Sequence, residues 1–262
     1  TAKYGQTLAD VTLPNGWSWM DSRGSVGGAS NAAKIFQAKF TPTDTDNYNV
    51  TENIELEVTV NKADQAALTI QGADSVFYGQ TLTLTASGGT GTGAVTYAVT
   101  NGTGEATIDP NTGVLTPVKV GSVSVIATKA GNNDYNDVTS APFALMVKPA
   151  TPTGAPKYTE ITTSGKTLAD AALTTEGSTL KPNGGKLEWV DDKDNVLSGD
   201  TKVEANTTYK WRFTPTDTNY TVLTGEIELY HKSGSSGGSG SSRIYNYYTI
   251  KAAAGAGGSI SP

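Results

Sequence analysis

Apolar and polar residues alternate along much of the chain, a pattern that predicts short β-strands. Leu82 and Leu84 are separated by a threonine. Ile54, Leu56 and Val58 are separated by glutamates. Successive side chains of an extended strand point to opposite faces, so one set enters a core and the other faces water. Long runs of helix-forming residues are absent, and the pattern therefore predicts an all-β chain.

Turn signals separate these predicted strands. Asn15-Gly16, Asn101-Gly102 and Asn183-Gly184 predict tight hairpins, because Asn and Gly tolerate positive φ. The residues from Asp109 to Gly113 predict a reverse turn before a strand at Val114-Leu115, and the apolar run Val123–Ile126 predicts the strand that closes this region. Strands separated by turns at such short intervals are typical of β-sandwiches.

The chain also repeats itself, which indicates two copies of one unit. Three segments of the first part return in the same order in the last part: 4–10 as 165–170, 40–48 as 213–220, and 52–58 as 225–229. A different unit with its own opening, Tyr78-Gly79-Gln80, lies between the two copies.

These observations predict three tandem β-sandwiches, a flexible Gly/Ser linker and a truncated C-terminal β segment. That the three sandwiches are immunoglobulin-like is what the family resemblance given below implies. Boundaries are expected near Asn61-Lys62-Ala63 and in the Pro-containing stretch Lys148–Thr153. The predicted domains are 1–62 (an N-terminally truncated repeat), 63–149, 150–232 (the second copy of the first type), the linker 233–246, and the start of a further repeat at 247–262.

Composition excludes several classes of function. The chain of 262 residues has 25 acidic and 19 basic residues, for a net charge of −6. Such a chain, without a basic cluster, is a poor partner for nucleic acid or for an anionic membrane. It contains no cysteine, which excludes disulfides, zinc–thiolate sites and thiol nucleophiles. No segment is apolar enough to insert into a membrane as a helix.

The middle part, from Ala66 to Val147, resembles a group-2-type bacterial immunoglobulin-like domain, through the stretches 109–115 and 120–127. The flanking copies resemble the Tyr-Gly-Gln-type repeats of surface proteins from Gram-positive gut bacteria. The third part departs from that pattern at Gly165-Lys166 and has a longer segment, Lys186–Asn206. The resemblance implies an extracellular protein, secreted or associated with the bacterial cell wall.

Two polar segments are candidates for catalysis. His231 is the only histidine, and it follows the last predicted strand, where no orienting partner or pocket is expected. The cluster Asp191–Asn195 could supply paired carboxylates for glycoside hydrolysis. Its position between two predicted strands favours a turn, where Asp and Asn bond to the local backbone. We therefore expect no enzyme activity and no catalytic residue.

A calcium site is the remaining candidate for metal binding. Asp44-Thr45-Asp46-Asn47 resembles the start of a calcium loop, and Glu55 stands at its twelfth position. Asn49 occupies the sixth position, where a sharp turn needs glycine. The second copy, Asp217-Thr218-Asn219, has one carboxylate fewer. A structural turn is favoured, no metal or cofactor is expected, and a loose calcium site stays open as the alternative.

Aromatic residues could instead form a platform for sugars. Trp17 and Trp19 align with Leu187 and Trp189 of the second copy, and a position that accepts leucine behaves as core. A second stripe aligns Phe36, Ala38 and Phe40 with Tyr209, Trp211 and Phe213. Both stripes are predicted to face inward. Four Asn-x-Thr sequons, at Asn49, Asn101, Asn206 and Asn219, are interpreted as coincidental, and Lys–Asn isopeptide bonds are permitted by composition.

The sequence thus predicts a non-catalytic stalk or spacer segment of an adhesin-like surface or secreted protein, present as a monomeric rod. Two alternatives stay open. The chain could bind a host glycan or host protein, such as a mucin glycan, a matrix protein or a secreted immunoglobulin, with Lys186–Asn206 as the first candidate surface. It could also comprise accessory domains of a large extracellular glycosidase or protease.

Overall fold

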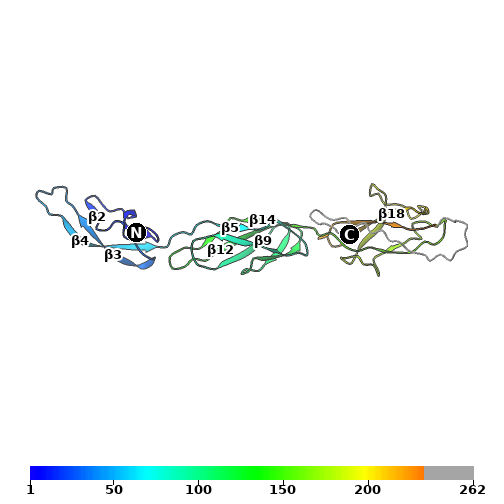
Figure 1. The fold of residues 1–262 in the computed structure, drawn as a ribbon, viewed down its shortest axis with the longest axis horizontal. Helices are drawn as coiled ribbons and strands as arrows, with labels where there is room; N and C mark the ends of the chain where they lie inside the picture. The colour runs from blue at the N-terminus through cyan, green and yellow to red at the C-terminus, as the bar shows by residue number, and fades with distance from the viewer. Residues whose placement is uncertain (233–262) are drawn as a thin grey trace, which may run out of the picture.

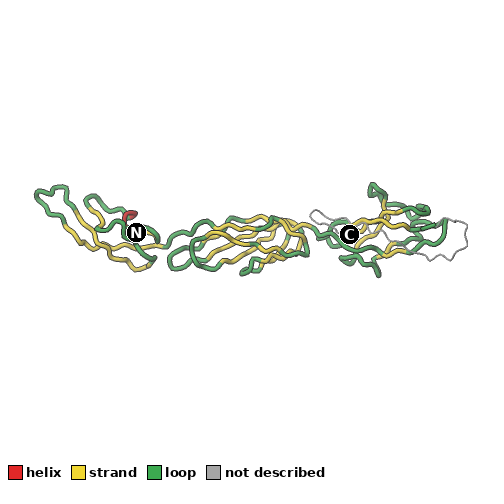
Figure 2. The backbone as a smooth tube through the Cα atoms, viewed as in Figure 1, coloured by secondary structure: helices red, strands yellow, loops and turns green. Residues whose placement is uncertain are grey.

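The computed structural model describes residues 1–232, so the predictions for 233–246 and 247–262 lie outside the described residues. Each sheet falls within one of three ranges, which we name the first unit (1–62), the second unit (63–149) and the third unit (150–232). The units follow one another along an elongated molecule (Figure 1). Apart from one 3-10 turn, η1 (Leu8–Asp10), the regular elements are strands (Figure 2). The predicted all-β fold, with several sheets in tandem units, is confirmed.

The second unit is a two-layer sandwich. One layer has the order β13-β12-β14-β6, with β9 also paired to β12, and the other consists of β10-β11-β7 and the pair β5-β8. The completely buried Leu84, Leu115 and Val125 belong to the core between the layers. Its strands are β5 (Leu68–Gln71), β6 (Ser75–Phe77), β7 (Leu82–Thr83), β8 (Thr85–Gly88), β9 (Val95–Asn101), β10 (Glu105–Ile108), β11 (Val114–Lys119), β12 (Gly121–Lys129), β13 (Val138–Thr139) and β14 (Phe143–Lys148).

Two local predictions for the second unit are wrong. Val123–Ile126 does not close the unit but lies in the central strand β12, between β9 and β14. Asn101-Gly102 is not a tight hairpin, because β9 pairs with β12 whereas β10 pairs with β11, so the chain changes sheets there. A Cβ on Gly102 would lie 2.7 Å from the carbonyl oxygen of Ser122. Close backbone approach, rather than a hairpin, therefore requires this glycine.

The first unit has a single sheet of the order β1-β4-β3-β2, formed by β1 (Ala2–Lys3), β2 (Trp17–Trp19), β3 (Ser30–Phe40) and β4 (Thr51–Asn61). β1 runs parallel to β4, as β6 does to β14 in the second unit. Turns and loops cover one face of the sheet. Leu8 and Val26, on these loops, are buried in the same core as Val58 and Val60.

The third unit repeats this plan with additional strands. Its strands are β15 (Lys157–Tyr158), β16 (Leu173–Thr174), β17 (Gly185–Val190), β18 (Thr208–Pro215) and β19 (Leu223–Glu228). The sheet β17-β18-β19 packs with the pair β15-β16. Leu168 donates its N–H to Thr201 at 2.9 Å, as Leu8 donates to Gly24 at 3.0 Å in the first unit. The sequence repeat is therefore also a repeat of backbone hydrogen bonds.

Candidate functional site

His231 lies on the surface after β19. Its Nδ1 is 2.8 Å from Oε1 of Glu228, and the imidazole side chain is 73% exposed. A Ser–His–Asp type of site needs a nucleophile on the other ring nitrogen and an enclosed position. Within residues 1–232, the ring has one hydrogen-bond partner, the carboxylate of Glu228. His231 therefore has the position of an exposed residue that is hydrogen-bonded to a neighbour on the surface.

The Asp191–Asn195 cluster forms the expected turn. The Asp191 carboxylate accepts hydrogen bonds from the N–H groups of Lys193 and Asn195, both at 2.9 Å, and from the Asn195 amide. Hydrogen bonds from Asn195, first through its side chain, lower the pKa of Asp191. A lowered pKa keeps the Asp191 carboxylate ionised, which suits a hydrogen-bond acceptor in a turn. A general acid needs a raised pKa instead.

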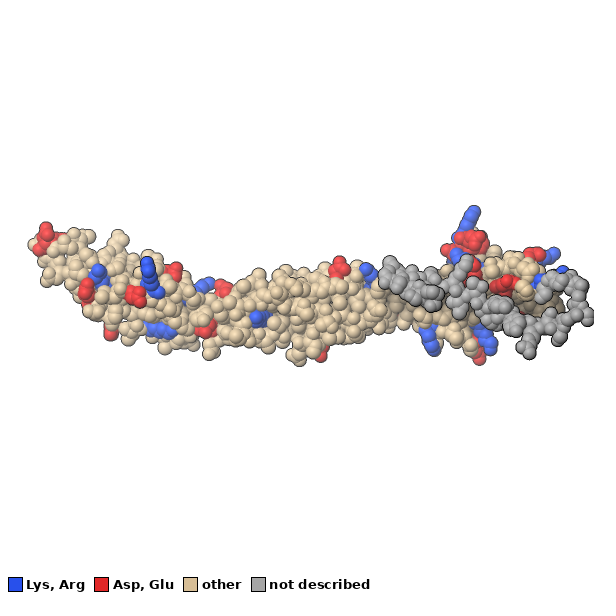
Figure 3. Space-filling view, viewed as in Figure 1, with Lys and Arg blue, Asp and Glu red and all other residues tan. Residues whose placement is uncertain are grey.

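Charged side chains on the adjoining sheet are paired with one another. Glu188 on β17 contacts Lys186 at 2.7 Å and Arg212 at 2.9 Å. Asp194 lies 2.7 Å from Lys210, and this contact raises the pKa of the lysine. On the face shown in Figure 3, charged side chains gather over the third unit and are sparse over the middle of the molecule. The segment Lys186–Asn206 thus carries a network of paired charges.

The suggested calcium residues lie in different contacts. Both oxygens of Asp44 accept hydrogen bonds from Asn47, at 3.1 Å from the backbone and 2.8 Å from the amide. The amide contact is the main cause of a lowered Asp44 pKa. Glu55 points from β4 toward Gln37, 3.4 Å away. No group of three potential metal ligands occurs among residues 1–232, and Asp44 serves as the cap of a turn.

The aromatic stripes lie in the positions that the alignment predicts. In the third unit Trp189, Tyr209, Trp211 and Phe213 are buried in one core. In the first unit Trp19 packs edge-on against Phe36, and Trp17 packs against Phe40. The core interpretation is confirmed for the third unit. In the first unit Ala38 is buried, whereas the aromatic residues Trp17, Trp19, Phe36 and Phe40 are only half buried.

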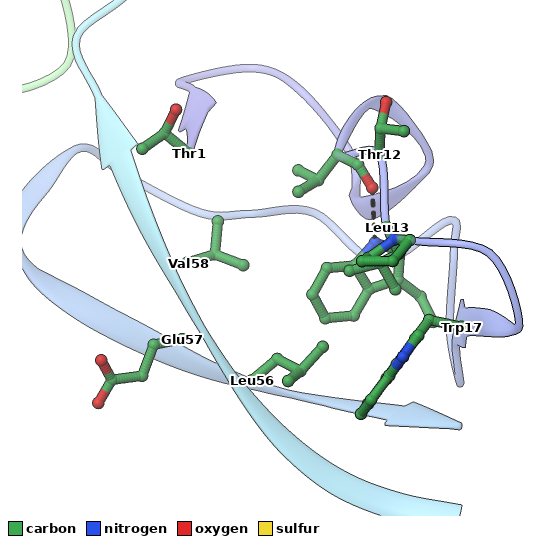
Figure 4. Close-up of a pocket in the computed structure, with 10 residues that line it drawn as sticks. Thr1, Thr12, Leu13, Trp17, Leu56, Glu57 and Val58 are labelled. Carbon is green, nitrogen blue, oxygen red and sulfur yellow. Dashed lines mark hydrogen bonds between the residues drawn. The ribbon is translucent and has the colours of Figure 1, made fainter. Parts of the chain in front are cut away.

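An open groove explains this difference. It has a volume of about 410 Å³ and lies on the first unit (Figure 4). Leu56 and Trp17 face it, whereas Glu57 points away. The groove is mainly apolar, and it is lined by Thr1, Val11, Thr12, Leu13, Pro14, Trp17, Trp19, Leu56, Glu57 and Val58.

The junction between the first and second units contains residues that the sequence patterns did not identify as contacts. Tyr4 packs edge-on against Tyr135, with ring centroids 5.2 Å apart. The Asp134 carboxylate accepts a 2.8 Å hydrogen bond from the N–H of Ala29, just before β3. Ala63 pairs with the same turn, donating to Asp134 and accepting from Asn136, both at 2.9 Å.

The junction between the second and third units has the same construction. Tyr78 packs edge-on against Tyr220, with ring centroids 5.5 Å apart. Oδ1 of Asn219 accepts a 2.9 Å hydrogen bond from the N–H of Val120, just before β12. Ala150 donates to Asn219 at 2.9 Å and accepts from Thr221 at 2.8 Å. The two junctions therefore use one set of contacts twice.

Three of the four sequon asparagines, Asn101, Asn206 and Asn219, make structural hydrogen bonds. Asn219 holds the second junction, as described above. Oδ1 of Asn101 accepts a 3.0 Å hydrogen bond from the N–H of Ala106 at the change of sheets. Asn206 accepts from the N–H of Lys232 at 2.9 Å, which holds the segment after β19. These three asparagines are explained by their hydrogen bonds without a glycan.

No family model matches the chain, and no curated protein matches it. Three solved structures show some similarity to the chain. Drosophila N-cadherin EC1-4 is 10% identical with a TM-score of 0.27, and the match covers 83% of this chain and 63% of that one. Mouse cadherin-23 EC22-24 is 12% identical with a TM-score of 0.32, covering 81% and 80%. Murine CEACAM1b is 16% identical with a TM-score of 0.22, covering 44% and 58%.

Proposed function

We propose that this chain is a non-catalytic stalk segment of an extracellular or cell-surface protein, in which junctions hold successive units at a fixed spacing. The observation that carries the proposal is the repeated junction: Tyr4 with Tyr135, and Tyr78 with Tyr220. A linker alone would allow the units to reorient freely. At each junction a ring contact and a side-chain hydrogen bond cross between the units and oppose that motion. Two backbone hydrogen bonds fix the linker residue, Ala63 or Ala150, to the unit that follows it.

The surface chemistry supports the same role. The acidic clusters and His231, all candidates for chemistry, are engaged in turns and local hydrogen bonds within the described residues. A spacer needs separation and stiffness rather than a reactive group. The bacterial origin and the cell-wall location rest on the sequence resemblance and form part of the proposal.

Small-angle X-ray scattering of the full chain tests this function. We expect one elongated shape for the natural chain, and a broader distribution of shapes with a smaller mean radius of gyration for the double variant N219A/Y220A. Tyr48→Ala is the matched control, because Tyr48 is 65% exposed and outside both junctions. A natural chain that already scatters as freely jointed units would overturn the proposal.

A further inference from the structure

We propose that the first unit carries the receiving half of a third such junction, which binds the Tyr-Gly end of another immunoglobulin-like unit. This inference rests on the proposed role of the two junctions within the chain. The receiving surface consists of the turn 44–48, which holds Asn47 and Tyr48, and of the apolar groove lined by Leu13, Trp17, Trp19 and Leu56.

The turn is the first observation. Asn47-Tyr48 aligns with Asp134-Tyr135 and Asn219-Tyr220. In each case a preceding Asx side chain holds the backbone N–H of the residue before the tyrosine: Asp44 at 3.1 Å, Asn132 at 2.9 Å and Asp217 at 2.9 Å. The three turns therefore share this Asx hydrogen bond, although the first turn has one residue more between the Asx and the tyrosine than the other two.

Among the residues that the structure describes, 1–232, no unit packs on the first turn, whereas one packs on each of the other two. Tyr135 and Tyr220 are half buried against Tyr4 and Tyr78, whereas Tyr48 is 65% exposed. Nδ2 of Asn47 donates a hydrogen bond to Asp44. Oδ1 of Asn47 is the counterpart of the Asn219 Oδ1 that accepts from the N–H of Val120. An exposed tyrosine beside such an amide has the composition of the receiving half of a junction.

The groove is a second, independent observation. Its residues Leu13, Trp17 and Leu56 correspond to Leu173, Leu187 and Ile227 of the third unit, by the repeat and by the strand register. In the third unit these residues pack on the closed core together with Tyr158. Tyr158 lies on β15 and pairs with Leu173 on β16.

The second unit also has a first strand that covers its core in this way: β5, which follows the linker, pairs with β8. In both cases the strand follows the linker that leaves a junction, after Ala63 or Ala150. The groove of the first unit is therefore a slot for an extended strand that places an aromatic or aliphatic side chain over Leu13 and Trp17. Apolar surface of this kind gains free energy when a strand covers it.

The end of the third unit argues against a second copy of this chain as the occupant. Tyr4 and Tyr78 precede Gly5 and Gly79, which have φ of 85° and 81°. In the third unit Gly165 keeps that conformation, with φ of 80°, but Ser164 replaces the tyrosine. Both tyrosines of a second copy are already used in its own junctions. The occupant is a separate unit of the second type, with a Tyr-Gly turn and an extended linker.

A chimera of the full chain tests this inference. Residues 63–160 are duplicated and joined in front of Thr1, the counterpart of Ile161, so that a second-type unit and its linker meet the first unit. We expect amide exchange in 44–50 and 11–19 to slow by about tenfold or more relative to the natural chain, because hydrogen bonds and burial are gained there. Asn47→Ala and Tyr48→Ala in the chimera should restore the fast exchange of 44–50.

Segments 132–137 and 217–221 report the existing junctions in the same samples. If these stay protected while 44–50 exchanges as in the natural chain, the receiving surface is disproved and the stalk proposal stands. If none of the three is protected, the stalk proposal fails as well. Sedimentation of the natural chain tests the rival occupant, since end-to-end self-association that Tyr48→Ala abolishes would overturn the assignment to a separate unit.

Discussion

Trp19 and Trp189 make the same hydrogen bond in two units that are far apart in the chain. Nε1 of Trp19 donates to the carbonyl oxygen of Val11 at 2.9 Å, and Nε1 of Trp189 donates to that of Ala171 at 3.1 Å. Each bond ties the edge strand of a sheet to the loop that covers the core. A polar atom inside an aromatic core is tolerated because it is paired.

Trp189→Phe should therefore destabilise the third unit more than Trp19→Phe destabilises the first. Removal of the indole N–H leaves the carbonyl of Ala171 without its partner in a buried position, at a cost of about 1–3 kcal/mol. Around Trp19 the groove admits water, and the cost should be about 1 kcal/mol or less. Amide exchange of β17 and β2 in the two variants measures the difference. A larger effect at Trp19 would contradict the assignment of the groove as open.

Phe213 gives a second test of the aromatic core. It is fully buried, and Phe213→Ala removes most of its side chain, so a loss of about 3–5 kcal/mol in the unfolding free energy of the third unit is expected. Phe77 is the matched control, because it is 50% exposed, with the Lys148 ammonium 6.0 Å from the centroid of its ring. Phe77→Ala should cost about 1 kcal/mol or less. Calorimetric unfolding of both variants checks the contrast.

The sequence predicted the parts of this molecule that depend on local pattern. Alternation predicted the buried Leu84 and Val58, and the repeat correctly paired Trp19 with Trp189. Asp191 could be recognised as a turn residue because its hydrogen bonds reach only neighbouring residues.

Non-local relations were harder to predict. Asn101-Gly102 has the composition of a hairpin, but the choice of partner strand is decided by packing of the whole sandwich. The motifs with Tyr4 and Tyr48 were both visible in the sequence, yet nothing in one unit shows that such tyrosines meet across a junction. The three copies of the Asx-Tyr pair, at 47–48, 134–135 and 219–220, were the signal that could have suggested it.

Asp109 links the stability of the second unit to pH. Its carboxylate accepts hydrogen bonds from the N–H groups of Thr112 and Asn111, both at 2.9 Å, and these contacts, Thr112 first, lower its pKa below 3.8. A carboxyl group with a lowered pKa in the folded state stabilises that state above its unfolded pKa. The contribution is lost as pH falls through the folded value.

Asp109→Asn keeps an acceptor for both N–H groups but removes the titration. As pH falls from 5 to 2, a range that spans the ordinary aspartate pKa of 3.8, we expect the melting temperature of the variant to decrease less than that of the natural chain. Asp74→Asn removes an equal charge at an exposed position whose side chain makes no hydrogen bond within residues 1–232, so it controls for net charge. Equal acid sensitivity of the Asp109 and Asp74 variants would show that the turn is not the source of the pH dependence. Calorimetry across that pH range, following the second unit, makes the comparison directly.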